Sequence, residues 1–132
     1  MIKRPAALIS VLLLLSPPAL AAPQAWSCRI ERVIVDSRTT FPDARERASN
    51  SSRLRFEADT EKGTGCLRTA EGECAVSYTG AIEGGGVLRL AATDAGGVLD
   101  LVNIWTASGR WVRLKGPTQW MGKPGDCEKA PG

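Results

Sequence analysis

The sequence of residues 98–115, VLDLVNIWTASGRWVRLK, decides which fold class the rest of the chain must follow. Two apolar, β-prone runs flank a short turn that contains Gly109, which is the pattern of a β-hairpin. A two-residue turn would need a positive φ at a serine as well as at the glycine, whereas a three-residue loop over 107–109 needs it only at Gly109. We therefore expect the three-residue loop, which places Trp105 opposite Trp111.

This register decides which side chains share a face of the hairpin, because successive residues of a strand alternate between faces. The expected core face is apolar and consists of Val102, Ile104, Val112 and Leu114. The expected outer face places an aromatic pair among polar groups and consists of Leu101, Asn103, Trp105, Trp111, Arg113 and Lys115. Such a face is typical of a binding surface, but a cross-strand tryptophan pair also stabilises a hairpin by about 0.5–1.5 kcal/mol, so a purely structural role fits equally well.

The first 21 residues have the pattern of a signal peptide. Lys3 and Arg4 precede an apolar run over 6–15, and the sequence ALA at 19–21 matches the small-x-small site that signal peptidase cuts. The run is too short to span a bilayer, and no cysteine directly follows the site to carry a lipid. The sequence therefore predicts export to the periplasm or outside the cell without a membrane anchor, and a single mature β-domain over 22–132.

Composition excludes several classes of function. The chain has 17 lysines and arginines against 14 acids, and cleavage of the signal removes two of the basic residues. A nearly neutral domain lacks the field that drives binding to nucleic acid. The chain also has no histidine, which excludes Ser-His-Asp and Cys-His catalysis and the zinc sites that contain histidine. We expect no cofactor, no metal site and no enzymatic activity.

The remaining candidates for acid–base chemistry are carboxylates near predicted turns: Glu71, Glu73, Asp94 and Asp100. Paired acids cleave glycosides when they are correctly separated, but these four have the setting of ordinary solvated turn residues. Asp100 is the exception, because it falls on the predicted core face of the hairpin. Either that end of the strand is wet, or Asp100 has a partner such as an arginine.

The cysteines are even in number, which in an exported chain predicts two disulfides. They are Cys28, Cys66, Cys74 and Cys127. Of the three possible pairings we favour Cys66–Cys74, which closes a short local loop, together with Cys28–Cys127, which joins the two ends of the domain. The main alternative pairs Cys28 with Cys66 and Cys74 with Cys127.

The chain as a whole predicts an all-β fold. About seven short strands, with turn signals between them and no convincing helix, indicate a small antiparallel barrel or sandwich tied by the disulfides. Residues 26–35 are expected to form one strand, although their alternation slips after Ile30. We expect residues 37–52 to form a mobile loop and residues 122–132 to form a Gly/Pro-rich tail that only Cys127 ties down.

The C-terminal third also resembles a known family. Residues 106–111, TASGRW, followed by Gly116, Trp120 and Cys127, are similar to the periplasmic inhibitors of C-type lysozyme, as is the sequence WSC at 26–28. The resemblance implies a small antiparallel barrel whose Ser-Gly loop enters the lysozyme cleft. There the hydroxyl of Ser108 would meet the catalytic carboxylates, with Gly109 shaping the loop and Arg110 assisting.

These observations together predict an exported, non-enzymatic binding protein with a protein partner in the cell envelope. The predicted partner-binding residues are Trp105, Ser108, Gly109, Arg110, Trp111 and Arg113. The resemblance narrows the hypothesis to an inhibitor of lysozyme or of another cell-wall hydrolase, acting through the hairpin at 98–115. The alternative is a structural or assembly component of the envelope that has no enzyme or small-molecule target.

Overall fold

The computed structural model describes residues 23–42 and 52–130, and twelve strands make up most of these ranges. They are β1 (Gln24–Arg29), β2 (Arg32–Val35), β3 (Arg38–Thr40), β4 (Arg53–Asp59), β5 (Thr64–Arg68), β6 (Cys74–Tyr78), β7 (Gly80–Gly84), β8 (Val87–Thr93), β9 (Leu99–Trp105), β10 (Trp111–Lys115), β11 (Thr118–Gly122) and β12 (Cys127–Lys129). The predicted signal peptide over 1–21 and most of the predicted loop over 37–52 lie outside the described residues.

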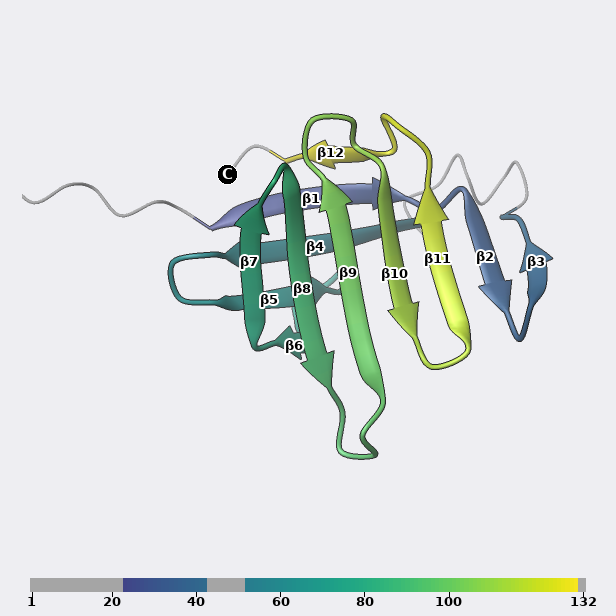
Figure 1. Cartoon of the computed structure of the whole chain (residues 1–132), viewed down its shortest axis with the longest axis horizontal. Coiled ribbons are helices and arrows are strands. Elements are labelled where there is room, and N and C mark those ends of the chain that lie inside the picture. Colours follow the sequence, from purple (N-terminus) through teal and green to yellow (C-terminus); the bar gives the residue numbers. More distant parts are fainter. Residues whose placement is uncertain (1–22, 43–51, 131–132) are drawn as a thin grey trace, which may run out of the picture.

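The strands form two antiparallel sheets that pack face to face. One sheet has five strands in the order β12-β1-β4-β5-β6, and the other has seven in the order β3-β2-β11-β10-β9-β8-β7. Figure 1 shows the strands of the five-stranded sheet running crosswise behind those of the seven-stranded sheet. The predicted all-β class is confirmed, and of the two architectures considered the chain adopts a sandwich and not a closed barrel.

The expected number of about seven strands was too low. The stretch over 26–35 forms two strands, because the chain leaves the five-stranded sheet after β1 and enters the seven-stranded sheet as β2. At the corner, the N–H of Ile30 donates to the Ser52 carbonyl (2.8 Å), and the next N–H, of Glu31, donates to the Met121 carbonyl of the other sheet (3.0 Å). The slip in alternation after Ile30 is the trace of this change of sheet.

Two segments expected to be irregular contain strands. The described part of the predicted tail, residues 122–130, is not loose: Gly122 ends β11, and β12 pairs with β1 so that Cys127 lies opposite Cys28. Within the predicted loop, Arg38–Thr40 forms β3 at the edge of the seven-stranded sheet. Both strands have only three residues, which is too short for the alternation of side chains to be visible in a sequence.

The core lies between the two sheets. Its largest fully buried side chains are Trp111, Tyr78, Phe56, Leu88, Leu90, Ile104, Val102 and Cys28. The Phe56 ring lies centrally, with its centroid 6.0 Å from that of Trp111 and 6.5 Å from that of Tyr78. The disulfides are Cys28–Cys127 and Cys66–Cys74, which is the favoured pairing.

The register predicted for the 98–115 hairpin was wrong by one residue. The loop has four residues, 106–109, because Trp105 pairs with Arg110 through a hydrogen bond from its N–H to the Arg110 carbonyl (2.9 Å). Trp111 therefore lies opposite Ile104 and not opposite Trp105. Since a shift of one residue exchanges the faces of a strand, every side chain of β10 points the opposite way from the prediction.

The exchange moves two predicted outer residues into the core and two predicted core residues out of it. Trp111 and Arg113 are buried, whereas Leu114 is exposed and Val112 is half-buried on the outer face. The faces of β9 are as expected, with Val102 and Ile104 fully buried. The requirement for a positive φ at Gly109 is confirmed, with a value of 78°.

Candidate functional site

Three of the six predicted partner-binding residues lie at the surface of the hairpin tip. The Trp105 ring is half-buried on the outer face of the seven-stranded sheet, and the guanidinium carbon of Arg110 lies 5.0 Å from its centroid. Ser108 is exposed, and its hydroxyl oxygen accepts the N–H of Arg110 (3.2 Å). We call Trp105, Ser108 and Arg110 the tip cluster.

The tip does not project freely from the molecule. The carbonyl oxygens of Ser108 and Gly109 accept hydrogen bonds from the N–H groups of Gly125 (2.7 Å) and Cys127 (2.8 Å). Gly109 is buried in this contact, and a Cβ there would lie 2.6 Å from the Cys127 carbonyl oxygen. The loop is therefore held against the segment that leads into β12, and Gly109 shapes this contact without being available to a partner.

Trp111 and Arg113 are also unavailable to a partner, which corrects their prediction as surface residues. The Trp111 indole is fully buried, and its N–H donates to the Arg29 carbonyl (2.8 Å). A buried indole needs such an acceptor, so this hydrogen bond completes its fit to the core. The predicted pair of tryptophans on the outer face does not form. Trp105 is on that face without Trp111, and its ring stacks with Arg110 instead.

Arg113 instead belongs to a polar cluster inside the core. Its Nε and Nη2 donate to the two oxygens of Asp100 at 3.0 and 2.7 Å, and the Tyr78 hydroxyl donates to Asp100 Oδ1 at 3.2 Å. The guanidinium carbon lies 4.4 Å from the centroid of the half-buried Trp120 ring. Of the two alternatives for Asp100, a wet strand end or an arginine partner, the structure contains the arginine partner.

The electrostatics of this cluster favour a structural role. Burial, and then the negative charge of Asp100, raise the pKa of Tyr78 well above its ordinary value. Burial alone would lower the pKa of Arg113, but its hydrogen bond to Asp100 and the surrounding charges raise it overall. A neutral phenol and a permanently charged guanidinium exchange no proton near neutral pH, and both oxygens of the Asp100 carboxylate accept hydrogen bonds from these two groups.

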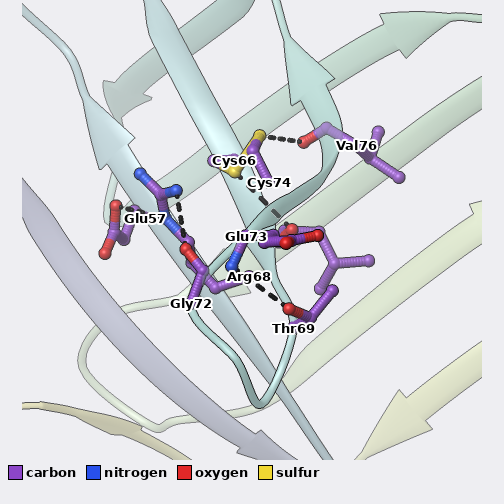
Figure 2. Close-up of polar contacts among 9 residues, drawn as sticks. Glu57, Cys66, Arg68, Thr69, Gly72, Glu73, Cys74 and Val76 are labelled. Carbon is purple, nitrogen blue, oxygen red and sulfur yellow. Dashed lines mark hydrogen bonds and ion pairs between the residues drawn. A yellow bond between two sulfur atoms is a disulfide. The ribbon is translucent and has the colours of Figure 1, made fainter.

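The other candidate carboxylates lie in turns, as the sequence indicated. Glu71 and Glu73 are exposed in the loop that the Cys66–Cys74 disulfide closes. Figure 2 shows this loop, in which the N–H of Glu73 donates to the Thr69 hydroxyl (3.1 Å). Asp94 Oδ1 accepts the backbone N–H groups of Gly96 and Val98 at 2.9 Å each. Within the described ranges, no group of three or more acids and cysteines could hold a metal ion.

A pocket of about 370 Å³ opens beside the tip cluster, between β10, β11 and β2. Its lining combines apolar side chains with three cations and one acid, and includes Glu31, Arg32, Arg110, Val112, Met121 and Lys123. The Nε–H of Arg32 contacts the sulfur of Met121 at 3.2 Å. This tip pocket was not predicted, because β11 and β2 come next to the hairpin only in the folded sheet.

The outer face of the same sheet also carries exposed aliphatic side chains. Ile82, Leu99 and Leu114 have exposed fractions of 68, 48 and 41%. Leu114 lies opposite the half-buried Leu101 across the β9–β10 ladder. The one-residue shift of β10 places Leu114 on this outer face, beside β9, the strand that ends at Trp105 of the tip cluster.

No protein-family model, curated protein or solved structure matches this chain.

Proposed function

We propose that this chain is an exported, non-enzymatic protein-binding module whose contact surface is centred on the tip cluster. The observation that carries the proposal is the stacking of the Arg110 guanidinium on the half-exposed Trp105 ring, on a loop held by backbone hydrogen bonds to residues 125 and 127. Tryptophan and arginine are the residue types that most often dominate binding energy at protein interfaces. A loop that is already rigid loses little conformational entropy when it binds.

Export is part of the proposal. The pattern of residues 1–21 supports it, and two structural disulfides are typical of an oxidising compartment such as the periplasm or the extracellular space. Among residues 23–42 and 52–130 there is no helix that could cross a membrane.

We propose more specifically that the partner is a C-type lysozyme or another cell-wall hydrolase. We call this the lysozyme form of the proposal, and binding to any other envelope protein the wider form. The resemblance of residues 106–111 to the lysozyme inhibitors supports this choice, with Ser108 exposed at the turn. Arg32, Arg110 and Lys123 beside the turn bring positive charge to the same surface, which complements a cleft that contains catalytic carboxylates. Gly109 then acts by allowing the turn, and the buried Trp111 and Arg113 act only by supporting it.

An inhibition assay tests this form. The mature, disulfide-bonded protein is titrated against a C-type lysozyme, beside the Ser108→Ala and Arg110→Ala variants and an Arg38→Ala control on the far edge strand β3. We expect micromolar inhibition by the parent and the control, and a loss of about tenfold or more in each tip variant. No inhibition at micromolar protein would end the lysozyme form of the proposal.

The wider form is tested by capture from an envelope extract. The parent should enrich at least one protein that Arg110→Ala fails to enrich and that Arg38→Ala still enriches. If all three proteins enrich the same set, the tip cluster is not a contact surface.

The second candidate is a structural or assembly component of the envelope, and the burial of Trp111 and Arg113 favours it. These two side chains are part of the core, so two of the hairpin's five aromatic and cationic side chains have a structural purpose. Under this reading the exposed aliphatic face, and not the tip, makes the contact. An Ile82→Ser, Leu114→Ser double variant would then abolish capture, while Arg110→Ala would leave it unchanged.

A further inference from the structure

The outward face of the five-stranded sheet carries a cluster of arginines, together with the acids Glu57 and Glu128. Four arginines from β1, β4 and β5 point to this side: Arg29, Arg53, Arg55 and Arg68. We call them the arginine face. Their strand neighbours Phe56 and Cys28 point to the core and are fully buried, so the alternation of the strands holds the arginines outward. This surface lies on the opposite sheet from the tip cluster.

The arrangement pairs like charges directly across the ladder. Arg29 lies opposite Arg53 in the β1–β4 register, and Arg55 lies opposite Arg68 in the β4–β5 register. Directly opposite residues have Cβ atoms only about 4.5–5.5 Å apart, and two like charges at such positions destabilise a sheet. These two opposed pairs therefore weaken the pairing of β1 with β4 and of β4 with β5.

The protein itself neutralises only part of the positive charge of the arginine face. Figure 2 shows Arg68 held by Glu57 (Nε–Oε2, 2.9 Å) and by the Gly72 carbonyl (3.1 Å). Arg53 donates to the uncharged Ser27 hydroxyl at 3.1 Å. Among the described residues, the guanidinium groups of Arg29 and Arg55 have no hydrogen-bond or ion-pair partner. Among residues 23–42 and 52–130, Arg29, Arg53 and Arg55 thus form no ion pair, although Glu128 lies on the same face opposite Ser27.

A pocket of about 670 Å³ lies on this face. Its lining combines cationic, hydroxyl and apolar groups and includes Ser27, Arg53, Arg55, Leu67, Arg68 and Thr69. Sites for small organic ligands in proteins measure roughly 300–1,000 Å³ and orient the ligand with a few polar groups. The pocket is therefore large enough for more than a single inorganic ion.

We propose that this pocket binds a small organic anion, a sugar that carries phosphate or carboxylate groups. The planar guanidinium fork of Arg53 or Arg55 matches both oxyanions with two parallel hydrogen bonds. The hydroxyls of Ser27 and Thr69 suit the hydroxyls of a sugar, and the apolar part of the lining suits its ring. An anion bound there reduces the repulsion between Arg55 and Arg68, the opposed pair that lines the pocket.

Isothermal titration calorimetry of the mature, disulfide-bonded protein tests this site. The probes are glucose 1-phosphate for the phosphate arm, digalacturonate for the carboxylate arm, inorganic phosphate for an ion alone and maltose for an uncharged sugar. The variants are Arg55→Ala and Arg55→Lys, and the control is Arg89→Ala, which removes an exposed arginine from β8 on the other sheet.

We expect at least one of the two sugar anions to bind, and to bind more tightly than inorganic phosphate or maltose. Arg55→Ala should weaken that binding by about tenfold or more, and Arg55→Lys should restore only part of it, because lysine keeps the charge but not the fork. Arg89→Ala should leave the affinity unchanged. The better of the two sugar anions identifies which oxyanion the site prefers.

Three results would overturn the proposal. The first is the absence of heat and of binding for both sugar anions at millimolar concentration. The second is an affinity for inorganic phosphate equal to that for the better sugar anion, which would mean that the pocket is only a nonspecific ion site. The third is an equal loss in Arg55→Ala and Arg89→Ala, which would make the effect one of net charge. None of these results bears on the tip cluster, so the two surfaces are tested independently.

Discussion

Asp100, Arg113 and Tyr78 show how single residues determine the interior of this protein. A carboxylate and a guanidinium are costly to bury, but the bidentate geometry at 2.7 and 3.0 Å satisfies both groups. No buried side-chain nitrogen or oxygen among the described residues lacks a partner. Removing one member of such a pair typically costs about 3–5 kcal/mol, because the other charge stays buried without compensation. The observed register of β10 places Arg113 inside, where it satisfies the buried Asp100.

Titration of Tyr78 tests this environment, and Tyr78 is the only tyrosine of the chain. Burial and the charge of Asp100 raise its pKa above the ordinary value of about 10. As pH rises past 10, the unfolded chain loses the phenol proton first, so the stability that Tyr78 contributes is complete below that pH and falls above it. We expect no phenolate absorbance from the folded protein between about pH 10 and 11.

The control is the same protein in denaturant with its disulfides reduced, in which the phenol should ionise near its ordinary pKa of about 10. An Asp100→Asn variant removes the negative charge and should lower the folded-state pKa. Phenolate absorbance that rises near pH 10 in the folded parent would contradict the burial of Tyr78 in this cluster.

At the scale of elements, the hairpin of β9 and β10 owes its register to β11. The Trp111 indole lies over Gly122, its partner residue in the β10–β11 ladder. A Cβ at Gly122 would overlap Nε1 and Cδ1 of that indole and lie 3.0 Å from the Arg29 carbonyl oxygen. The absence of a side chain at Gly122 is thus what leaves room for the largest fully buried side chain.

Gly122→Ala should therefore destabilise the protein by about 1–3 kcal/mol, the usual cost of overpacking a core. Urea unfolding followed by tryptophan fluorescence measures this loss as a lower midpoint. The matched control is Gly84→Ala in β7, where a Cβ would meet nothing within 4 Å. Equal stability of Gly122→Ala and Gly84→Ala would mean that the indole does not occupy this position.

At the scale of the whole molecule, the fold depends on contacts between the two ends of the described chain. Strands β1 and β12 pair at the edge of the five-stranded sheet, and the Cys28–Cys127 disulfide joins residues 99 positions apart. The hairpin tip docks onto the segment just before β12. The second disulfide spans only 8 positions and closes a local loop at the other edge of the sheet.

The two disulfides should therefore differ in their effect on stability. In the loop-entropy model, the long loop closed by Cys28–Cys127 adds about 4–5 kcal/mol to the free energy of unfolding. The short loop closed by Cys66–Cys74 adds about 2–3 kcal/mol. Urea unfolding of the Cys28→Ala, Cys127→Ala and the Cys66→Ala, Cys74→Ala double variants measures both losses. A loss for the local disulfide equal to or larger than that for the long one would show that strain or residual structure, and not loop closure, dominates.

The tip cluster and the arginine face illustrate how much of a site is visible in a sequence. Trp105, Ser108 and Arg110 lie at the surface, and the turn pattern that drew attention to them is local. Trp111 and Arg113 were misplaced because the loop length that orients β10 differs by one residue. The opposition of Arg55 and Arg68 could not be predicted at all, since it depends on how β4 pairs with β5.

Local sequence patterns were enough to predict the β class, the alternation of β9, the positive φ of Gly109 and the favoured disulfide pairing. These properties depend on patterns within a few residues, or on which cysteines can close a short loop. Long-range contacts in the folded chain set the register of β10, the change of sheet between β1 and β2, and the formation of β12. A one-residue shift leaves local propensities almost unchanged, so it is chosen by distant contacts: the space at Gly122 for Trp111, and Asp100 as the partner of Arg113.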